Sequence, residues 1–343
     1  MALLVALGAI WFLVELFQPL HGAGHGRVRV RIPKSAGASQ IGQILAHDGV
    51  VSSAFFFKLR AALAGDRDKL LAGTYEIPLG VSYSQALTIL TTPPKSAPVR
   101  DVTIIDGLAR AQIDALLRHE RVHGSYLADT RRSKLLDPRR YGAPKHTPSL
   151  EGFLYPDTYQ LREPLRIPAL VADQLKRFKQ EFAKVSFAYA RSKHLTPYDV
   201  LIIASLVEAE ARTAHDRALA ASVIYNRLAD GMDLGLDTTA AYAADNYSGS
   251  LTQAQLNSRS PWNTLNHKGL PPTPIDSPSL ASIEAAAHPP RTGYLYFIVK
   301  VCGNGSLAFT SNYQQFLADS QAYQEALHKH GQQRTEFCAK RHG

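Results

Sequence analysis

The sequence predicts an α+β protein, in which an N-terminal apolar helix precedes a small α+β module and a mainly helical domain with a short β-sheet. Three observations indicate this class. An almost unbroken apolar stretch occupies residues 2–20. Segments of strand period and helix period alternate over residues 28–92. Helix period then dominates until a pair of strand-like segments at 292–301 and 307–310.

The chain of 343 residues is long enough for two or three domains with their own cores. Composition shifts and turn-rich segments divide it into four parts. We predict a membrane anchor at 1–22, a module with its linker at 23–98, a main domain at 99–330 and a C-terminal tail at 331–343.

The predicted anchor has about the length that spans a bilayer, and Pro19 and a glycine-rich linker end it. We expect it to remain uncleaved, because no small-residue cleavage site clearly follows. Glu15 lies inside the stretch, and arginines at 27, 29 and 31 follow it while no basic residue precedes it. An N-out orientation, or a start that misses a few basic residues, would account for this pattern. A buried core helix is the alternative interpretation.

The chain carries 38 Lys and Arg against 29 Asp and Glu, which gives a formal net charge of +9. This charge favours a polyanionic partner such as nucleic acid, anionic lipid or a carboxylate-rich cell-wall polymer. We expect no nucleic-acid partner, because zinc-finger spacing, basic-aromatic interleaving and a phosphate-binding glycine loop are all missing from the sequence. The two cysteines, Cys302 and Cys338, are too few for a disulfide framework or a cysteine-based metal site. They form either one disulfide or two free thiols.

Residues 28–92 predict a compact β-α-α-β-α module, and the linker follows at 91–98. Its predicted elements are strands at 28–32 and 71–78 and helices around 41–45, 55–59 and 84–90.

The predicted main domain begins with a strand at 102–105 and ends with two strands, at 292–301 and 307–310, that pair across the turn at 302–305. Its helices are predicted at 111–117, 171–182, 196–212, 218–228 and 280–287. Residues 131–145 are basic and rich in Pro and Gly, so they predict an exposed loop. The long proline-rich segment at 262–279 is typical of a functional or a disordered loop.

The most informative segment is TPYDVLIIASLVEAEAR at 196–212. Thr196 fits the N-cap of a helix, Pro197 fits the first helical position, and Asp199 places a negative charge in the first turn. The residues that follow are nearly all apolar, so we expect this helix to be buried on most sides.

Two glutamates, Glu208 and Glu210, end this helix. They point about 200° apart, so they cannot both face one cleft. Glu210 follows the apolar stripe formed by Ile203, Leu206 and Val207, whereas Glu208 lies on the more polar side. An apolar setting keeps a carboxyl protonated near neutral pH, which suits a general acid. The alternative is that both glutamates are solvated at a fraying helix end.

Seven strings between about residues 28 and 325 occur together in an order that is typical of one family. They are LAGTYEIP at 71–78, LEGFLYPDTYQL at 150–161, LIIASLVEAEAR at 201–212, ASVIYNRLADGM at 221–232, LDTTAAYA at 236–243, WNTLNHKGLPPTPI at 262–275 and AAAHPPRTGYLYF at 285–297. In them the chain resembles the endolytic murein transglycosylases of the MltG, or YceG-like, family, which are membrane-anchored enzymes of the bacterial envelope. The resemblance implies a LysM-like module at 23–98 and a lysozyme-like catalytic domain at 99–330.

The resemblance also implies a reaction: cleavage of the β-1,4 bond between N-acetylmuramic acid and N-acetylglucosamine within nascent peptidoglycan strands. The products carry 1,6-anhydromuramoyl ends, and the cleavage terminates glycan elongation. The family motif places the catalytic acid at Glu210, in agreement with the stripe argument, and implies no metal or other cofactor. A single carboxyl suffices, because the 2-acetamido group of the substrate can stabilise the cationic centre.

Other residues match the family motifs with supporting roles. The supporting residues are Glu208 and Asn226, and the substrate-binding residues are Tyr155, Asp157, Asp237, Thr238, Trp262 and Asn263. Asn226 would bind an acetamido group or orient Glu210, and Thr238 replaces the proline of the family's Asp-Pro-Thr turn. Structural alternatives remain for four of them: a solvated Asn226, a packed Tyr155, a turn-forming Asp157 and a Trp262 that anchors the core.

The implied location is the bacterial inner membrane, with a single span and the catalytic domain on the periplasmic side. The implied partners are glycan strands, the membrane and peptidoglycan synthases. Two other functions remain open: a non-catalytic glycan-binding or divisome scaffold, and a lysozyme-like hydrolase. The retained Glu210 argues against the scaffold, and the lack of a convincing second carboxylate argues against the hydrolase.

Overall fold

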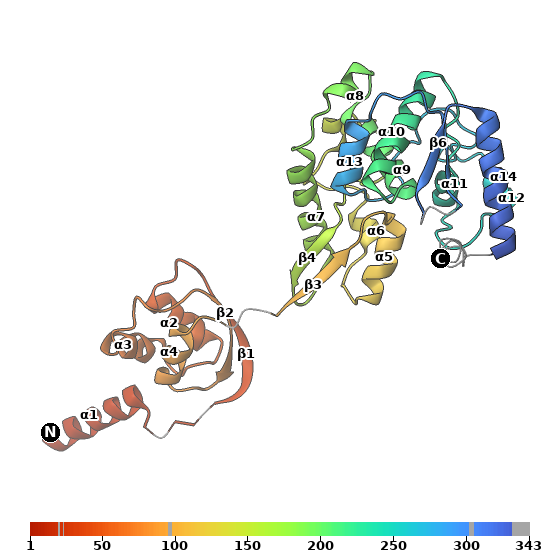
Figure 1. Cartoon of the computed structure of the whole chain (residues 1–343). Helices are drawn as coiled ribbons and strands as arrows, with labels where there is room; N and C mark the ends of the chain where they lie inside the picture. Colours follow the sequence, from red (N-terminus) through yellow and green to blue (C-terminus); the bar gives the residue numbers. More distant parts are fainter. Residues whose placement is uncertain (20, 23, 95–97, 302–304, 331–343) are drawn as a thin grey trace, which may run out of the picture. The chain divides into compact units, whose positions relative to one another are not determined.

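The structure is a computed structural model that describes residues 1–19, 21–22, 24–94, 98–301 and 305–330 (Figure 1). The chain forms two compact units, Met1–Ala97 and Pro98–Gly343. Both cysteines and the predicted C-terminal tail lie outside the described residues.

The N-terminal helix α1 spans Ala2–Phe17, 16 residues. It ends there because Gln18 adopts a left-handed conformation, with φ of 42°, directly before Pro19. The Gln18 carbonyl oxygen of the side chain accepts a hydrogen bond from the backbone N–H of Tyr83 at 2.9 Å. Within the described part of the chain, no helix combines the length and hydropathy that a membrane crossing requires. The predicted transmembrane helix over 2–20 is therefore not shown, and α1 is shorter than predicted.

The acidic residue within α1 has partners in the same unit. The Glu15 carboxylate accepts hydrogen bonds from the hydroxyls of Tyr83 at 3.2 Å and Ser52 at 3.3 Å. Leu16, beside it, is buried. The C-terminal end of α1 thus packs onto the module, whereas most of its other apolar side chains are exposed.

The rest of the first unit has the predicted β-α-α-β-α order. Its elements are β1 (His25–Ile32), α2 (Ala38–His47), α3 (Ala54–Leu63), β2 (Gly73–Leu79) and α4 (Tyr83–Thr91). The two strands are antiparallel, with Val30 opposite Tyr75. Alternate residues of both strands are buried against the three helices, and Phe57 is among the fully buried side chains of this core.

The second unit is mainly helical, with two small antiparallel sheets, β3-β4 and β5-β6. Its elements are β3 (Val99–Ile104), α5 (Arg110–His119), α6 (Tyr126–Asp129), the 3-10 helix η1 (Pro138–Tyr141), β4 (Asp157–Arg162), α7 (Ile167–Phe182), α8 (Ala188–Ser192), α9 (Pro197–Glu210), α10 (Ala214–Ala229), α11 (Asp237–Ala243), α12 (Gln253–Leu256), α13 (Leu280–Ala287), β5 (Tyr296–Val299), β6 (Leu307–Thr310) and α14 (Tyr313–His330). The chain is thus a mixed α and β protein with small sheets and many helices.

The strands of the second unit include one predicted pair and one strand that the sequence analysis missed. The pairing of β5 with β6 confirms the predicted hairpin, although most of its predicted turn, at 302–304, lies outside the described residues. Strand β4 was not predicted. It pairs with β3 in a register that places Val102 opposite Tyr159. Tyr159 and Leu161 are buried between exposed neighbours, so this six-residue segment does have the period of a strand, and the sequence analysis missed that signal.

Helix α9 lies in the middle of the second unit, packed against α10, α11 and α13 (Figure 1). Its start is as predicted: the Thr196 hydroxyl accepts from the backbone N–H of Asp199, and the Asp199 carboxylate accepts in return from the N–H of Thr196. Every residue from Val200 to Val207 is buried. This burial fixes the helix on all sides and so fixes the position of the two glutamates at its end.

Candidate active site

Glu210 is the last residue of α9 and is half-buried. Its Oε1 accepts a hydrogen bond from the Thr238 hydroxyl at 2.7 Å. Burial raises the pKa of Glu210 to about 7; the Thr238 hydrogen bond opposes this shift, and the negative charge of Asp237 adds to it. The raised pKa expected from the apolar setting is therefore present. A carboxyl with such a pKa is able to donate and to accept a proton near neutral pH.

Glu208 lies in a different environment, with only 5% of its side chain exposed. Its Oε1 forms an ion pair with Nη2 of Arg217 on α10 at 3.1 Å. Its Oε2 accepts from the backbone N–H of Ser279 at 2.8 Å and from the Ser279 hydroxyl, at the N-cap of α13. The sequence placed Glu208 on the more polar side of the helix, and its partners are indeed polar; the alternative of a solvated Glu208 is wrong, because this carboxylate is buried and joins α9, α10 and α13.

Helix α11 presents two residues of the predicted substrate-binding set to the site. Its first residue, Asp237, is exposed. Thr238, which replaces a proline of the family motif, supplies the hydroxyl that contacts Glu210. Because proline has no hydroxyl, this contact depends on the residue type in this chain. The structure therefore gives Thr238 a positioning role that the sequence did not predict.

A threonine pair that the sequence analysis missed holds this helix in place. The Thr239 hydroxyl is fully buried, donates to the backbone oxygen of Leu236 at 2.6 Å and lies 2.9 Å from the hydroxyl of Thr264. Thr264 belongs to the WNT segment, so this pair fastens the start of α11 to the proline-rich loop. No periodic pattern in either segment singled out this pair, because the two threonines lie 25 residues apart in the chain.

The two predicted asparagines are structural. The Asn226 amide donates to the backbone oxygens of Thr292 at 2.9 Å and Tyr294 at 2.8 Å. Both amide hydrogens therefore bond to the segment before β5 and neither bonds to Glu210. Asn263 is fully buried and donates to the backbone oxygens of Leu256 and Ser258, each at 2.9 Å. Asn226 thus shows no contact with Glu210 and is half-buried, and the fully buried Asn263 shapes the loop around it. The predicted substrate contacts of both residues stay predictions.

Trp262 is half-buried, and its indole N–H donates to the Thr273 hydroxyl at 2.9 Å. Its ring lies 6.4 Å from the ring of Tyr242 on α11, centroid to centroid. The tryptophan therefore packs against the helix that carries Thr238 while one part of it remains exposed. Its predicted stacking on a sugar stays a prediction.

Glu151 is a buried carboxyl that the sequence analysis did not single out, although it lies inside the LEGFLYPDTYQL string. It accepts hydrogen bonds from the backbone N–H of Arg110 at 3.1 Å and from the Tyr242 hydroxyl at 3.2 Å. Burial raises its pKa to about 7. The next residue, Gly152, has φ of 81°, and a Cβ there would lie 2.5 Å from Pro274, so only glycine fits. The sequence signal that could have identified Glu151 was its position, an acidic residue among the mostly apolar residues of this string.

Asp276 extends this acidic region. It is 3% exposed, its Oδ1 has no hydrogen-bond partner within the described residues, and burial raises its pKa well above the ordinary value. The negative charges of Glu208, Glu151 and Asp106 raise it further. Burial and the nearby carboxylates therefore both favour the neutral form of Asp276.

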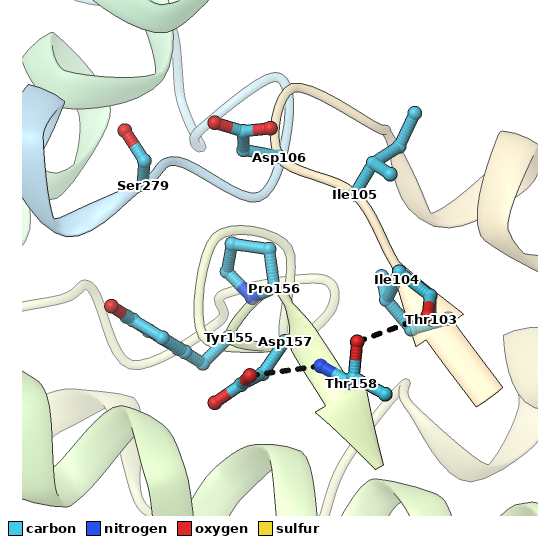
Figure 2. A pocket seen from close by; sticks show the side chains of 9 residues that line it. All are labelled: Thr103, Ile104, Ile105, Asp106, Tyr155, Pro156, Asp157, Thr158 and Ser279. Atoms are coloured by element: carbon cyan, nitrogen blue, oxygen red, sulfur yellow. Dashed lines mark hydrogen bonds between the residues drawn. The ribbon is translucent and has the colours of Figure 1, made fainter. Parts of the chain in front are cut away.

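The structure does not bring Tyr155 and Asp157 to Glu210. They line a separate pocket of about 230 Å³, opposite Asp106 and Ser279 (Figure 2). Tyr155 is 9% exposed, and the Asp157 carboxylate forms an ion pair with Nε of Arg177 at 2.8 Å. This pocket meets the glutamate pair on the Glu208 side, because Ser279 contacts Glu208. No contact in the described part of the chain joins Glu210 to Tyr155 or Asp157 in one groove.

We predict that Thr238→Val raises the pKa of Glu210 by about one unit, because a hydrogen bond to the charged carboxylate is lost and the ionised form becomes less stable. An NMR titration of the glutamate side-chain carboxyl carbons measures this shift. Thr238→Ser is the matched control, since serine keeps the donor and should keep the pKa near 7. An unchanged Glu210 pKa in the valine variant would show that the hydroxyl does not act on the carboxylate.

Comparisons with known proteins agree with this arrangement. The sequence profile of the YceG-like family matches residues 30–322. An endolytic murein transglycosylase of Bacillus subtilis (strain 168) is 28% identical over 327 residues, which cover 91% of this chain and 89% of that protein. One of Streptococcus pneumoniae (strain R6) is 27% identical, and the match covers 88% of this chain but 59% of that longer protein. A crystal structure of a yceG-like protein from Listeria monocytogenes superposes with a TM-score of 0.57 at 26% identity, over 86% of this chain and 99% of that one. The profile match covers most of the chain, and this protein therefore belongs to the YceG-like family.

Proposed function

We propose that this protein is an endolytic lytic transglycosylase, which cleaves the β-1,4 bond between N-acetylmuramic acid and N-acetylglucosamine within nascent peptidoglycan strands. The products would carry 1,6-anhydromuramoyl ends, and the cleavage would terminate glycan elongation. The observation that carries the proposal is Glu210: a half-buried carboxyl with a pKa of about 7 at the end of a helix whose residues 200–207 are all buried. The names of the Bacillus and Streptococcus relatives support the same activity.

In the proposed mechanism, Glu210 first acts as an acid and then as a base. Thr238 donates to Oε1, which leaves Oε2 to carry the acidic proton. Glu210 gives this proton to the glycosidic oxygen, and as a carboxylate it then accepts the proton of the muramoyl 6-hydroxyl as that oxygen attacks C1. A pKa of about 7 suits both steps, because neither protonation state is strongly disfavoured at neutral pH. Since the first step needs the protonated form, cleavage should slow as the pH rises through about 7.

A lysozyme-like hydrolase is the second candidate, and one observation favours it: the Asp237 carboxylate acts on the pKa of Glu210 and is exposed. A second carboxylate beside the acid is what a hydrolytic glycosidase uses to activate water or to bind the sugar. The mass of the products separates the two reactions, because hydrolysis adds one water to each cleaved bond and transglycosylation adds none.

We predict that Glu210→Gln lowers the rate of strand cleavage by a factor on the order of 10²–10⁴ and leaves the melting temperature nearly unchanged, because glutamine keeps the volume but has no acidic proton. Glu208→Gln is the matched control. It should cost less activity but lower the stability by about 3 kcal/mol, since Arg217 would lose its buried partner. Mass spectrometry of digested strands and thermal unfolding measure both effects. A Glu210→Gln protein that still makes anhydromuramoyl ends at the normal rate, with Glu208→Gln inactive, would reverse the assignment.

We propose further that the N-terminal segment attaches the protein to the bacterial inner membrane as a single pass, with the second unit on the periplasmic side. The support is the exposed apolar surface of α1, which monomeric soluble proteins rarely carry. Its large exposed side chains are Leu3, Leu4, Val5, Leu7, Ile10, Trp11, Phe12, Leu13, Val14 and Phe17. We propose peptidoglycan synthases as the partner proteins at that membrane. In-cell cross-linking tests this proposal: a covalent adduct with a synthase would support it, and the absence of any such adduct would contradict it.

We predict that the full-length protein sediments with membranes and that removal of residues 1–22 releases a folded, soluble protein. The deletion removes the apolar side chains of α1, whose transfer from water to lipid is the expected driving force for membrane binding. Fractionation and circular dichroism measure the two outcomes. A full-length chain that stays monomeric in buffer without detergent would refute the attachment.

We propose that residues 28–92 form a LysM-like module that binds glycan strands. Its β-α-α-β-α order supports the proposal, and so does its separation from the unit that contains Glu210.

We predict that deletion of 28–92 lowers activity on long strands much more than on short ones, because a second binding site raises the effective concentration only of substrates that reach both sites. Cleavage rates on length-fractionated glycans measure the difference. Equal losses on short and long glycans, or unfolding of the remaining unit, would show that the module is structural.

A further inference from the structure

A second pocket of the Pro98–Gly343 unit, which we call the basic pocket, has a volume of about 570 Å³ and is formed by residues 131–139 and 144–150. Its lining contains none of the residues around Glu210. Six basic residues contribute to it: Arg131, Arg132, Lys134, Arg139, Lys145 and His146. Asp137 is the one acidic residue among those that line it. The pocket therefore concentrates positive charge in a way that the proposed catalytic site does not explain.

Most of this positive charge is not neutralised within the protein. Asp137 pairs with Arg139, whose Nη2 lies 2.7 Å from the carboxylate, and this pairing lowers the pKa of Asp137. Over the described residues, the side chains of Arg131, Arg132, Lys134 and Lys145 form no hydrogen bond or ion pair, and all four are exposed. Four cations thus surround one cavity without a counter-charge. Such a cluster creates a local positive potential that attracts anions.

The floor of the basic pocket is built from buried residues. Leu136 and Leu150 are 5% and 1% exposed, and Ser149 is 8% exposed. The backbone N–H of Leu150 donates to the backbone oxygen of Thr130 at 2.9 Å, which holds the two segments of the pocket together. The cavity is therefore a defined feature of the fold.

The loop that carries the basic residues is held to the body of the unit as well. Asp137 caps η1 by accepting from the backbone N–H of Arg139 at 3.1 Å. The Tyr141 ring, at the end of η1, lies 5.5 Å from the ring of Phe153 and 5.6 Å from that of Phe178. The predicted exposed loop at 131–145 is thus exposed in its basic side chains but packed along one side. Packing of this kind pre-organises the cations and lowers the entropic cost of binding.

We propose that the basic pocket binds a phosphate group with two or more negative charges. Guanidinium groups bind phosphate oxygens in pairs, and lysine ammonium groups add point charges, so a compact multivalent phosphate engages several of the four unpaired cations at once. A single carboxylate would leave most of them unpaired. The group could belong to a soluble pyrophosphate or to a lipid headgroup, and the two sources share this chemistry. The proposal goes beyond the proposed catalytic function and does not depend on it.

Isothermal titration calorimetry of the full-length protein in detergent tests the proposal, first with inorganic pyrophosphate and then with a short-chain phosphatidic acid below its micellar concentration. We expect saturable binding of at least one of them, and tighter binding of one identifies the source. Arg131→Gln combined with Arg132→Gln should weaken this binding by about tenfold or more, because charge-assisted hydrogen bonds are lost. Neither side chain has a partner in the described part of the chain, so the variant should melt at the normal temperature.

The matched control is Lys176→Gln combined with Arg191→Gln, which removes the same charge from exposed positions that do not line the basic pocket. It should bind like the unmodified protein. Three results would overturn the proposal: no saturable binding of either phosphate compound, an equal loss of affinity in the control, or citrate that binds as tightly as pyrophosphate. The last would show that the pocket selects charge in general instead of phosphate.

Discussion

The second unit depends on the burial of one helix, α9, on all of its sides. Each fully buried aliphatic side chain contributes about 1.5–3 kcal/mol to stability, and α9 carries an unbroken run of buried residues from Val200 to Val207. Its neighbours α10, α11 and α13 are all held against it. Because the helix cannot rotate or slide without exposing this surface, the carboxyls at its C-terminal end have fixed positions. The chemistry proposed for this protein follows from that constraint.

The two glutamates at this end show how one helix creates two different carboxyls. Glu208 meets a cation and a helix N-cap, Arg217 and Ser279, and both stabilise its charge. Glu210 meets one hydroxyl, that of Thr238, and no cation forms an ion pair with it within the described residues. One side therefore joins three helices through a buried charge. The Glu210 side keeps a carboxyl with a pKa of about 7, which can be protonated or ionised near neutral pH.

Charge is distributed unevenly over the second unit. Glu151, Asp276 and Glu208 form a buried acidic region in which burial raises the pKa of the first two. The lining of the basic pocket ends directly before Glu151 in the chain, since Ser149 and Leu150 line that pocket. Buried acids can lower their cost by taking up protons, whereas exposed arginines and lysines stay charged. Their remaining charge is available for a ligand, and this difference is the physical basis for placing an anion site there.

The sequence by itself determined the features that depend on residues close together in the chain. The start of α9 at Thr196 and Pro197, its burial, the order of elements in the module and the β5-β6 hairpin all belong to this class, as does the more apolar setting of Glu210. Only the tertiary structure decided which distant groups meet these residues. Thr238 lies 28 residues from Glu210 in the chain, and Tyr242 lies 91 from Glu151. The roles of Asn226 and Asn263, the separate pocket of Tyr155 and Asp157, and the ion pair of Glu208 likewise depend on how helices and loops pack. Local periodicity carries no information on such contacts, because the packing of whole elements sets them.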